Sequence, residues 1–292
     1  MTSSADTGAS TRVARQGGAV RPDGGPDVSV FGGWTVRLVA GLTLLFLGLP
    51  IVVLIARAIL DGSLADAITT PVVLDALLLS LATTSVSLVL TAVFGLPVAW
   101  LLARRTFRGS WLVETIVDLP IVLPPAVAGL GLLLVFGRRG LLGEPFDLSI
   151  PFTTLAVVLA QTFVSAPFFI RSARTGISNV DLDLEAAARV DGASEFQVFR
   201  RITTPLAATA LAAGLVMAWA RALGEFGATI MFAGNIEGRT QTLPLVVYGE
   251  FQGGDLDASV AAAAILVLAA FGVLVAVRIL HWGRALDTRR LA

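Results

Sequence analysis

Residues Leu77–Val93 read LLLSLATTSVSLVLTAV and include no charged side chain. Crossing the roughly 30 Å of hydrocarbon in a bilayer takes about 20 helical residues, and apolar residues on both sides extend this run beyond that length. A backbone in lipid must bond its N–H and C=O groups internally, which favours a helix. The run also lacks the alternation of a barrel strand. It therefore predicts a helix that spans a membrane.

Five further apolar stretches are of similar length, and the composition agrees with a membrane protein. Hydrophobic residues make up 55% of the 292 residues and charged residues only 14%, whereas soluble domains carry roughly a quarter charged residues. We therefore predict an all-α integral membrane protein with six spanning helices. The predicted spans are Val36–Leu60, Asp75–Ala103, Thr115–Phe136, Phe152–Arg171, Pro205–Phe232 and Ala258–His281.

The amino-terminal residues 1–33 have a different composition from the rest of the chain. They are rich in Gly, Ser, Asp, Arg and Pro and show no apolar period, which predicts a disordered tail. The first apolar run begins only near Val36, too late for a signal peptide, so we expect it to be a retained helix. The transmembrane domain is expected to occupy residues 34–292.

The arginines predict the orientation of the chain, because loops on the cytoplasmic side are enriched in basic residues. With the amino terminus inside, Arg221 falls within the fifth span, and most of the other arginines lie on the inner side. The outer loops then carry only Arg57, Arg138, Arg139 and Arg239. This asymmetry predicts a multi-pass cell-membrane protein whose two termini are both cytoplasmic.

Several missing residue types exclude classes of chemistry. The chain has no cysteine and a single histidine, His281, so we expect no metal site. All its basic residues are arginine, and a phosphate-binding loop of the GxxxxGK[ST] kind needs a lysine. The net charge of +0 gives no bias towards nucleic acid. We expect no catalytic residue here, and any ATP chemistry must belong to a partner.

The inner loop 172–204 is predicted to form two short amphipathic helices. Asp181 or Asp183 can cap the first helix, Gly192 can end it, and Ser194 can cap the second. Two helices that meet at a glycine would form a protruding knob. The alternative is a helical hairpin that lies on the membrane surface.

The segment Glu185–Pro205 reads EAAARVDGASEFQVFRRITTP. It resembles the signature loop of bacterial and archaeal ABC importer permeases, which is EAA, a glycine, nine residues and then I-x-L-P. Gly192, Ile202 and Pro205 match the spacing. Ala186 occupies the usual glutamate position while Glu185 stands one residue earlier, and Thr204 replaces the usual leucine.

The resemblance implies an ABC importer permease (MetI-like) fold and a set of partners. These would be a second copy of the chain, two cytoplasmic ATPase subunits that bind ATP and Mg, and an extracytoplasmic binding protein. The loop would insert into a cleft on the ATPase. Its implied contact residues are Glu185, Ala186, Ala187, Gly192, Ala193, Ser194, Ile202 and Pro205.

The fifth span contains an ionisable pair, Arg221 and Glu225. The two residues are four apart and share a helical face, and charged residues within a membrane are a functional hypothesis by default. We interpret the pair as part of the pore wall or gate, where Arg221 offers a forked donor to an oxyanion. The alternative is a pair that only fixes helix packing. The pathway candidates are Arg221, Gly224, Glu225, Gly227, Thr229 and Asn235.

Three motifs narrow the resemblance. They are DLPIVLPPAVAG at 118–129, RALGEFGAT at 221–229, and AGN followed by GRTQTLP within 233–244. They are similar to those of the molybdate and tungstate permeases, over a core of about residues 75–285. The resemblance implies import of a tetrahedral oxyanion. A sulfate or thiosulfate permease of the same architecture, a stand-alone anion channel and a membrane enzyme remain alternatives.

Overall fold

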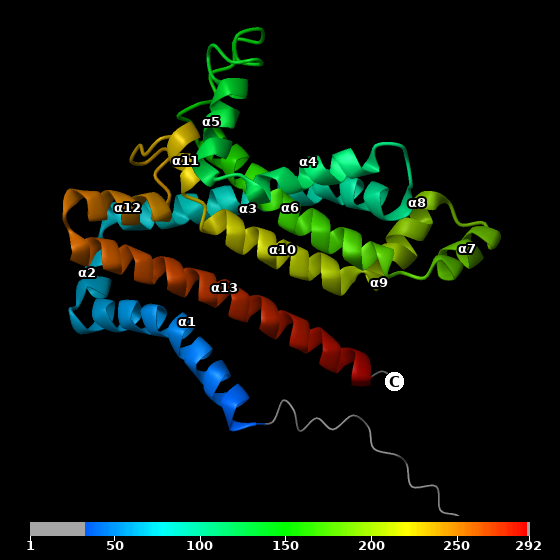
Figure 1. Cartoon of the computed structure of the whole chain (residues 1–292), viewed down its shortest axis with the longest axis horizontal. Helices are drawn as coiled ribbons and strands as arrows, with labels where there is room; N and C mark the ends of the chain where they lie inside the picture. The colour runs from blue at the N-terminus through cyan, green and yellow to red at the C-terminus, as the bar shows by residue number, and fades with distance from the viewer. Residues whose placement is uncertain (1–32, 291–292) are drawn as a thin grey trace, which may run out of the picture. The chain divides into compact units, whose positions relative to one another are not determined.

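The structure is a computed structural model that describes the backbone of residues 33–290 and the side chains of residues 33–275. The disordered tail predicted for residues 1–33 lies outside the described residues, apart from Gly33. The described part is helical and contains no strand. Its elements (Figure 1) are α1 (Trp34–Leu60), α2 (Ser63–Thr69), α3 (Pro71–Arg104), α4 (Ser110–Val122), α5 (Pro125–Phe136), α6 (Thr154–Ser178), α7 (Leu182–Val190), α8 (Glu195–Val198), the π-helical turn η2 (Phe199–Thr203), α9 (Thr204–Leu206), α10 (Ala208–Leu223), α11 (Gly227–Phe232), α12 (Leu243–Gly253) and α13 (Leu256–Arg290).

The chain divides into two units at Pro50, inside α1. The first unit contains the part of α1 from Trp34 to Pro50, and no side chain in this part is buried. A helix whose apolar side chains are exposed all round is suited to lipid rather than to water. The second unit begins at Ile51 and contains all the other helices.

Four helices are long and apolar enough to cross a membrane, and two bent pairs raise the number to as many as six. The four are α1, α3, α6 and residues Leu256–Val275 of α13. The bent pairs are α4 with α5, which turn by 117°, and Glu195–Leu206 with α10, which turn by 74°. The all-α membrane architecture is therefore as predicted.

Two of the predicted spans are not continuous helices. The third is broken at Leu123 and Pro124, which are both extended (ψ 136° and 132°), because a residue before proline is pushed out of the α region. The fifth ends at Leu223 and resumes in α11 at Gly227. The 117° turn at these prolines was not predicted from the sequence.

The centre of the second unit is a polar seam between α3 and α6. Ser80, Thr84, Ser87 and Thr91 follow one another at helical spacing on α3, and all four are buried. Gln161 Nε2 donates to Thr84 Oγ1 at 3.3 Å, and Thr162 Oγ1 donates to Ser87 Oγ at 3.1 Å. Small hydroxyl side chains allow helices to approach closely in a membrane, so this seam favours close packing of α3 against α6.

Candidate functional site

The loop after α6 folds as the sequence predicted, into two helices that meet at a glycine. Asp181 caps α7 by accepting a bond from the Asp183 backbone at 2.9 Å. Gly192 has a φ of +86°, which glycine adopts freely and other residues rarely do. Ser194 and Gln197 then form a capping box at the start of α8. We call the segment from α7 to α8 the coupling bend, after the ATPase contact that its sequence resemblance implies.

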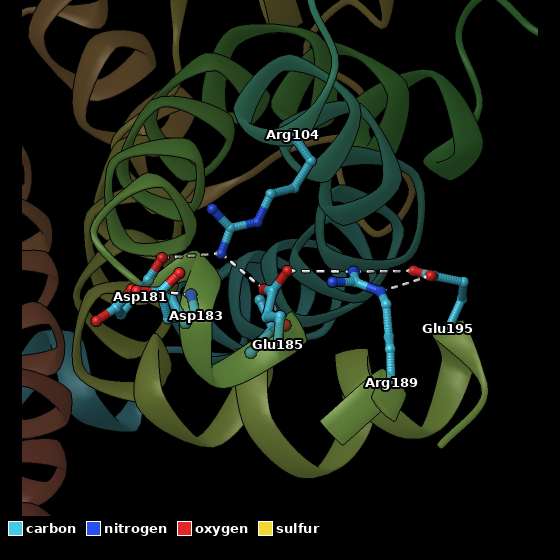
Figure 2. A network of polar contacts seen from close by, with 8 residues as sticks. Arg104, Asp181, Asp183, Glu185, Arg189 and Glu195 are labelled. Atoms are coloured by element: carbon cyan, nitrogen blue, oxygen red, sulfur yellow. Dashed lines mark hydrogen bonds and ion pairs between the residues drawn. The ribbon is translucent and has the colours of Figure 1, made fainter. Parts of the chain in front are cut away.

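A buried ion pair attaches the coupling bend to the rest of the chain (Figure 2). Glu185 is only 3% exposed, and its Oε1 accepts bonds from Arg104 Nη2 and from Thr203 Oγ1, each at 2.7 Å. Arg104 ends α3 and also donates to the Val180 carbonyl at 3.2 Å. Because Thr203 belongs to η2, which leads into α9 and α10, one carboxylate joins α7 to two separate helical segments.

A second ion pair closes the bend itself. Arg189 of α7 donates to both carboxylate oxygens of Glu195 at the start of α8, at 2.7 and 3.1 Å. The hydrogen bond from Arg189 lowers the pKa of Glu195 below its usual range, and the same bond raises the pKa of Arg189. Both side chains are exposed, Arg189 by 39% and Glu195 by 65%, so this pair contributes less to stability than the buried one.

The predicted contact residues of the coupling bend differ in exposure. Glu185 is buried, and Ala193 and Ile202 are partly buried. The exposed ones are Ala186, Ala187, Gly192, Ser194 and Pro205. Sequence reasoning missed Arg104 and Thr203 as partners of Glu185, and the only signal for Arg104 was a basic residue at the end of a span.

Two large apolar residues of the coupling bend were also missed. Val190 is 87% exposed and Phe196 is 68% exposed. Outside lipid, such side chains are costly to leave in water and mark interaction surfaces when they gather. They lie on either side of Gly192, and Phe196 also lines a groove with Leu96 and Trp100 of α3, so the bend presents apolar surface.

The pair in the fifth predicted span lies at the break between α10 and α11. Arg221 Nη1 is 2.6 Å from Glu225 Oε2, although the two groups are not aligned for a hydrogen bond. Glu225 is buried, and its Oε1 accepts a bond from the Ala228 backbone at 2.8 Å. Glu225 therefore bridges the break, from Arg221 on one side to the first turn of α11 on the other.

The remaining pathway candidates surround or follow this break. Gly224 ends α10 and Gly227 begins α11. Thr229 is buried within α11, and its hydroxyl has no hydrogen-bond partner among the described residues. Asn235 lies in the loop after α11, where its Nδ2 donates to the Leu245 carbonyl at 3.4 Å. The structure thus brings four candidates together and places Thr229 and Asn235 further along the chain.

Residues 95–284 match the family described as "Binding-protein-dependent transport system inner membrane component". The match covers well over half of the chain, and the chain belongs to this family of membrane transport subunits. The particular relatives are molybdenum permeases. The chain is 42% identical over 238 residues to the molybdenum transport system permease protein ModB of Mycobacterium tuberculosis, covering 80% of this chain and 89% of that protein. It is 43% identical over 191 residues to the protein of the same name from Escherichia coli K12, covering 63% and 83%.

Solved ABC transporters share the fold. A bacterial importer of the polysaccharide alginate aligns with a TM-score of 0.70 and 17% identity, over 89% of this chain and 97% of its own. The MetNI methionine transporter aligns with a TM-score of 0.58 and 21% identity, over 72% and 94%. The predicted fold class is confirmed by these similarities.

Proposed function

We propose that the chain is the channel-forming subunit of an ATP-driven importer for molybdate or tungstate. Its relatives are named as molybdenum permeases, and tungstate has the same charge and tetrahedral shape. The chain contains no lysine, so the ATP and Mg are bound by two copies of a separate cytoplasmic ATPase. A second copy of the chain completes the pore, and an extracytoplasmic binding protein delivers the anion. Both termini lie in the cytoplasm.

The single observation that carries the coupling mechanism is the position of Glu185. Its bonds to Arg104 and Thr203 tie an exposed bend to the end of α3 and to the segment before α10. When the ATPase closes on ATP, it displaces the coupling bend, and these bonds pass the displacement to α3 and α10. The break between α10 and α11 then rearranges. Arg221, held by Glu225 until that moment, becomes a forked donor for the passing oxyanion.

Uptake by the reconstituted complex tests the proposal. Liposomes that hold the permease and its ATPase partner should accumulate tungstate and molybdate only with internal ATP and external binding protein. Accumulation of sulfate alone would show that the substrate is wrong. An anion conductance that persists without the ATPase would show that the chain is a channel instead.

A further inference from the structure

A cavity lies where the end of α5 meets the segment before α6 and the loop after α11. Its volume is about 490 Å³, and its lining residues are Leu133, Gly137, Arg138, Ser149, Pro151, Phe152 and Arg239. The two charged lining residues are both arginines, and no carboxylate lines the cavity. Within the described part of the chain, neither Arg138 nor Arg239 makes an ion pair.

The cavity lies at the opposite end of α6 from the coupling bend. Pro151 and Phe152 come just before the first residue of α6, whereas the last turn of α6 leads into α7. The 25 residues of α6 span about 37 Å at 1.5 Å per residue, which is enough to cross the hydrocarbon of a bilayer. Figure 1 shows α5 and α11 together at one end of α6, and α7 and α8 at the other. With both termini in the cytoplasm, as proposed above, the cavity faces the side from which an importer receives its substrate.

The wall of the cavity contains a residue, Phe152, in an unfavourable backbone conformation. Phe152 has a φ of +61°, a left-handed conformation that is rare for a bulky residue. Its backbone N–H donates to the Phe232 carbonyl at 3.4 Å, and its ring packs against Gly234. Thr154 Oγ1 donates to the Arg239 carbonyl at 2.9 Å, which ties the Arg239 loop to the start of α6. Such conformations persist where the surrounding structure enforces them, and they cluster at functional sites.

We propose that this cavity binds a tetrahedral oxyanion before the anion enters the pathway. Two guanidinium groups supply forked donors that match the oxygens of such an ion, and the Ser149 hydroxyl supplies a further donor. The amino-terminal end of α6 adds a favourable positive potential. Both arginines are exposed, so an incoming ion can reach them. The inference rests on the proposed function. It adds to that function an anion-binding site at the outer face.

Direct binding of tungstate tests the site. The complex of the permease with its ATPase is titrated with sodium tungstate by calorimetry, without the binding protein. The double variant Arg138→Gln/Arg239→Gln should weaken binding by about tenfold or more, because it removes two charge-assisted contacts. Arg139→Gln is the matched control, since Arg139 is adjacent and exposed but does not line the cavity. It should bind tungstate as the parent complex does.

A second variant guards against a failure of the double variant to assemble. The double variant Arg138→Lys/Arg239→Lys keeps both charges but removes the paired guanidinium donors. Its tungstate affinity should lie between that of the parent and that of the double glutamine variant. Anomalous scattering from tungsten should place the ion between Arg138 and Arg239. An unchanged tungstate affinity in the double glutamine variant would overturn the proposal. So would a variant that binds tungstate normally and loses affinity for the binding protein, because the cavity would then be a docking surface for that protein.

These outcomes are separate from a failure of the proposed function. If the parent complex imports no molybdate or tungstate in liposomes, the proposed function is wrong. If the parent complex imports tungstate and the double glutamine variant binds it as tightly as the parent, only the cavity has been misassigned.

Discussion

Glu185 differs from the other acidic residues of the coupling bend because it lies inside the protein. Three donors of the same chain surround its carboxylate, from Arg104, Thr203 and, at 3.4 Å, Arg189. A carboxylate that is buried and bonded in this way positions the helix that carries it, rather than meeting a partner directly. The residues free to contact a partner are those with exposed side chains around Gly192.

Replacing Glu185 should therefore affect folding and coupling together. Glu185→Ala leaves Arg104 buried without its carboxylate, and breaking a buried pair in this way costs about 3–5 kcal/mol. We expect a clearly lower midpoint of thermal unfolding in detergent, together with loss of uptake. Glu195→Gln is the control, because it breaks an exposed ion pair in the same bend and should lower the midpoint much less. Equal losses in the two variants would contradict the role of the buried pair.

The Arg189–Glu195 pair predicts a dependence on pH. The pKa of Glu195 is lowered in the folded protein by the bond from Arg189, so the pair stabilises the bend at neutral pH. This contribution is lost as the pH falls through the lowered pKa. The unfolding midpoints of the parent and of Glu195→Gln should therefore differ at pH 7, and the difference should shrink as the pH falls below 4.5 and vanish below the lowered pKa of Glu195. A difference that grows on acidification would contradict the assignment.

At the scale of elements, the helices show which features hydropathy can predict. The apolar runs located all four long helices that can span a membrane, because length and composition decide that property. They did not locate the 117° turn between α4 and α5, since hydropathy carries no information about direction. The helix α12 was missed because its sequence follows a polar segment without a new long apolar run. The Asp181 cap and the Gly192 turn of the coupling bend were predicted, because each depends only on residues close by in the sequence.

The coupling bend yields a prediction at Gly192. A Cβ added there has no atom within 4 Å, so the cost at the backbone is that of the left-handed conformation, about 1–2 kcal/mol. Gly254→Trp is a matched control, because Gly254 has the same φ of +86° and the same open surroundings. Gly192→Trp should abolish ATP-dependent uptake while membrane insertion stays normal, and Gly254→Trp should not. Normal uptake by Gly192→Trp would refute docking of the bend.

The break between α10 and α11 allows a similar comparison. A Cβ at Gly227 would lie 2.7 Å from Pro125 Cβ, whereas the nearest atom to a Cβ at Gly224 would be 3.6 Å away. Gly227→Ala should therefore push α11 from α5, at a cost of about 1–3 kcal/mol, and it should lower the rate of uptake. Gly224→Ala should be close to neutral in both thermal unfolding and uptake. Equal effects of the two substitutions on unfolding and uptake would contradict close packing of α11 against α5 at Gly227.

At the scale of the whole molecule, the sites lie on two faces. The positive cavity is at one end of α6 and the coupling bend at the other, with the Arg221–Glu225 pair on the helices that connect them. The sequence predicted the coupling bend and the pair, but not the cavity, because Arg138 and Arg239 are 101 residues apart and no local pattern brings them together. The pairing of Glu185 with Arg104 could not be predicted for the same reason.

The absence of cysteine makes the orientation simple to measure. A single cysteine at Ala186, which is exposed on the coupling bend, should react with an impermeant thiol reagent only from the cytoplasmic side. A cysteine at Arg139 should react only from the outside. The parent chain, which has no cysteine to label, is the negative control for both variants. Labelling of both positions from the same side would contradict the predicted topology.

The seam of hydroxyls between α3 and α6 has a consequence for how transport is timed. Helices that meet through apolar side chains alone can slide past each other, but bonds such as those of Thr84 and Ser87 hold α3 and α6 in register. These bonds join the two helices near the middle of α3. A displacement of the coupling bend would therefore move both helices as one body, and the rearrangement at the break between α10 and α11 would follow it.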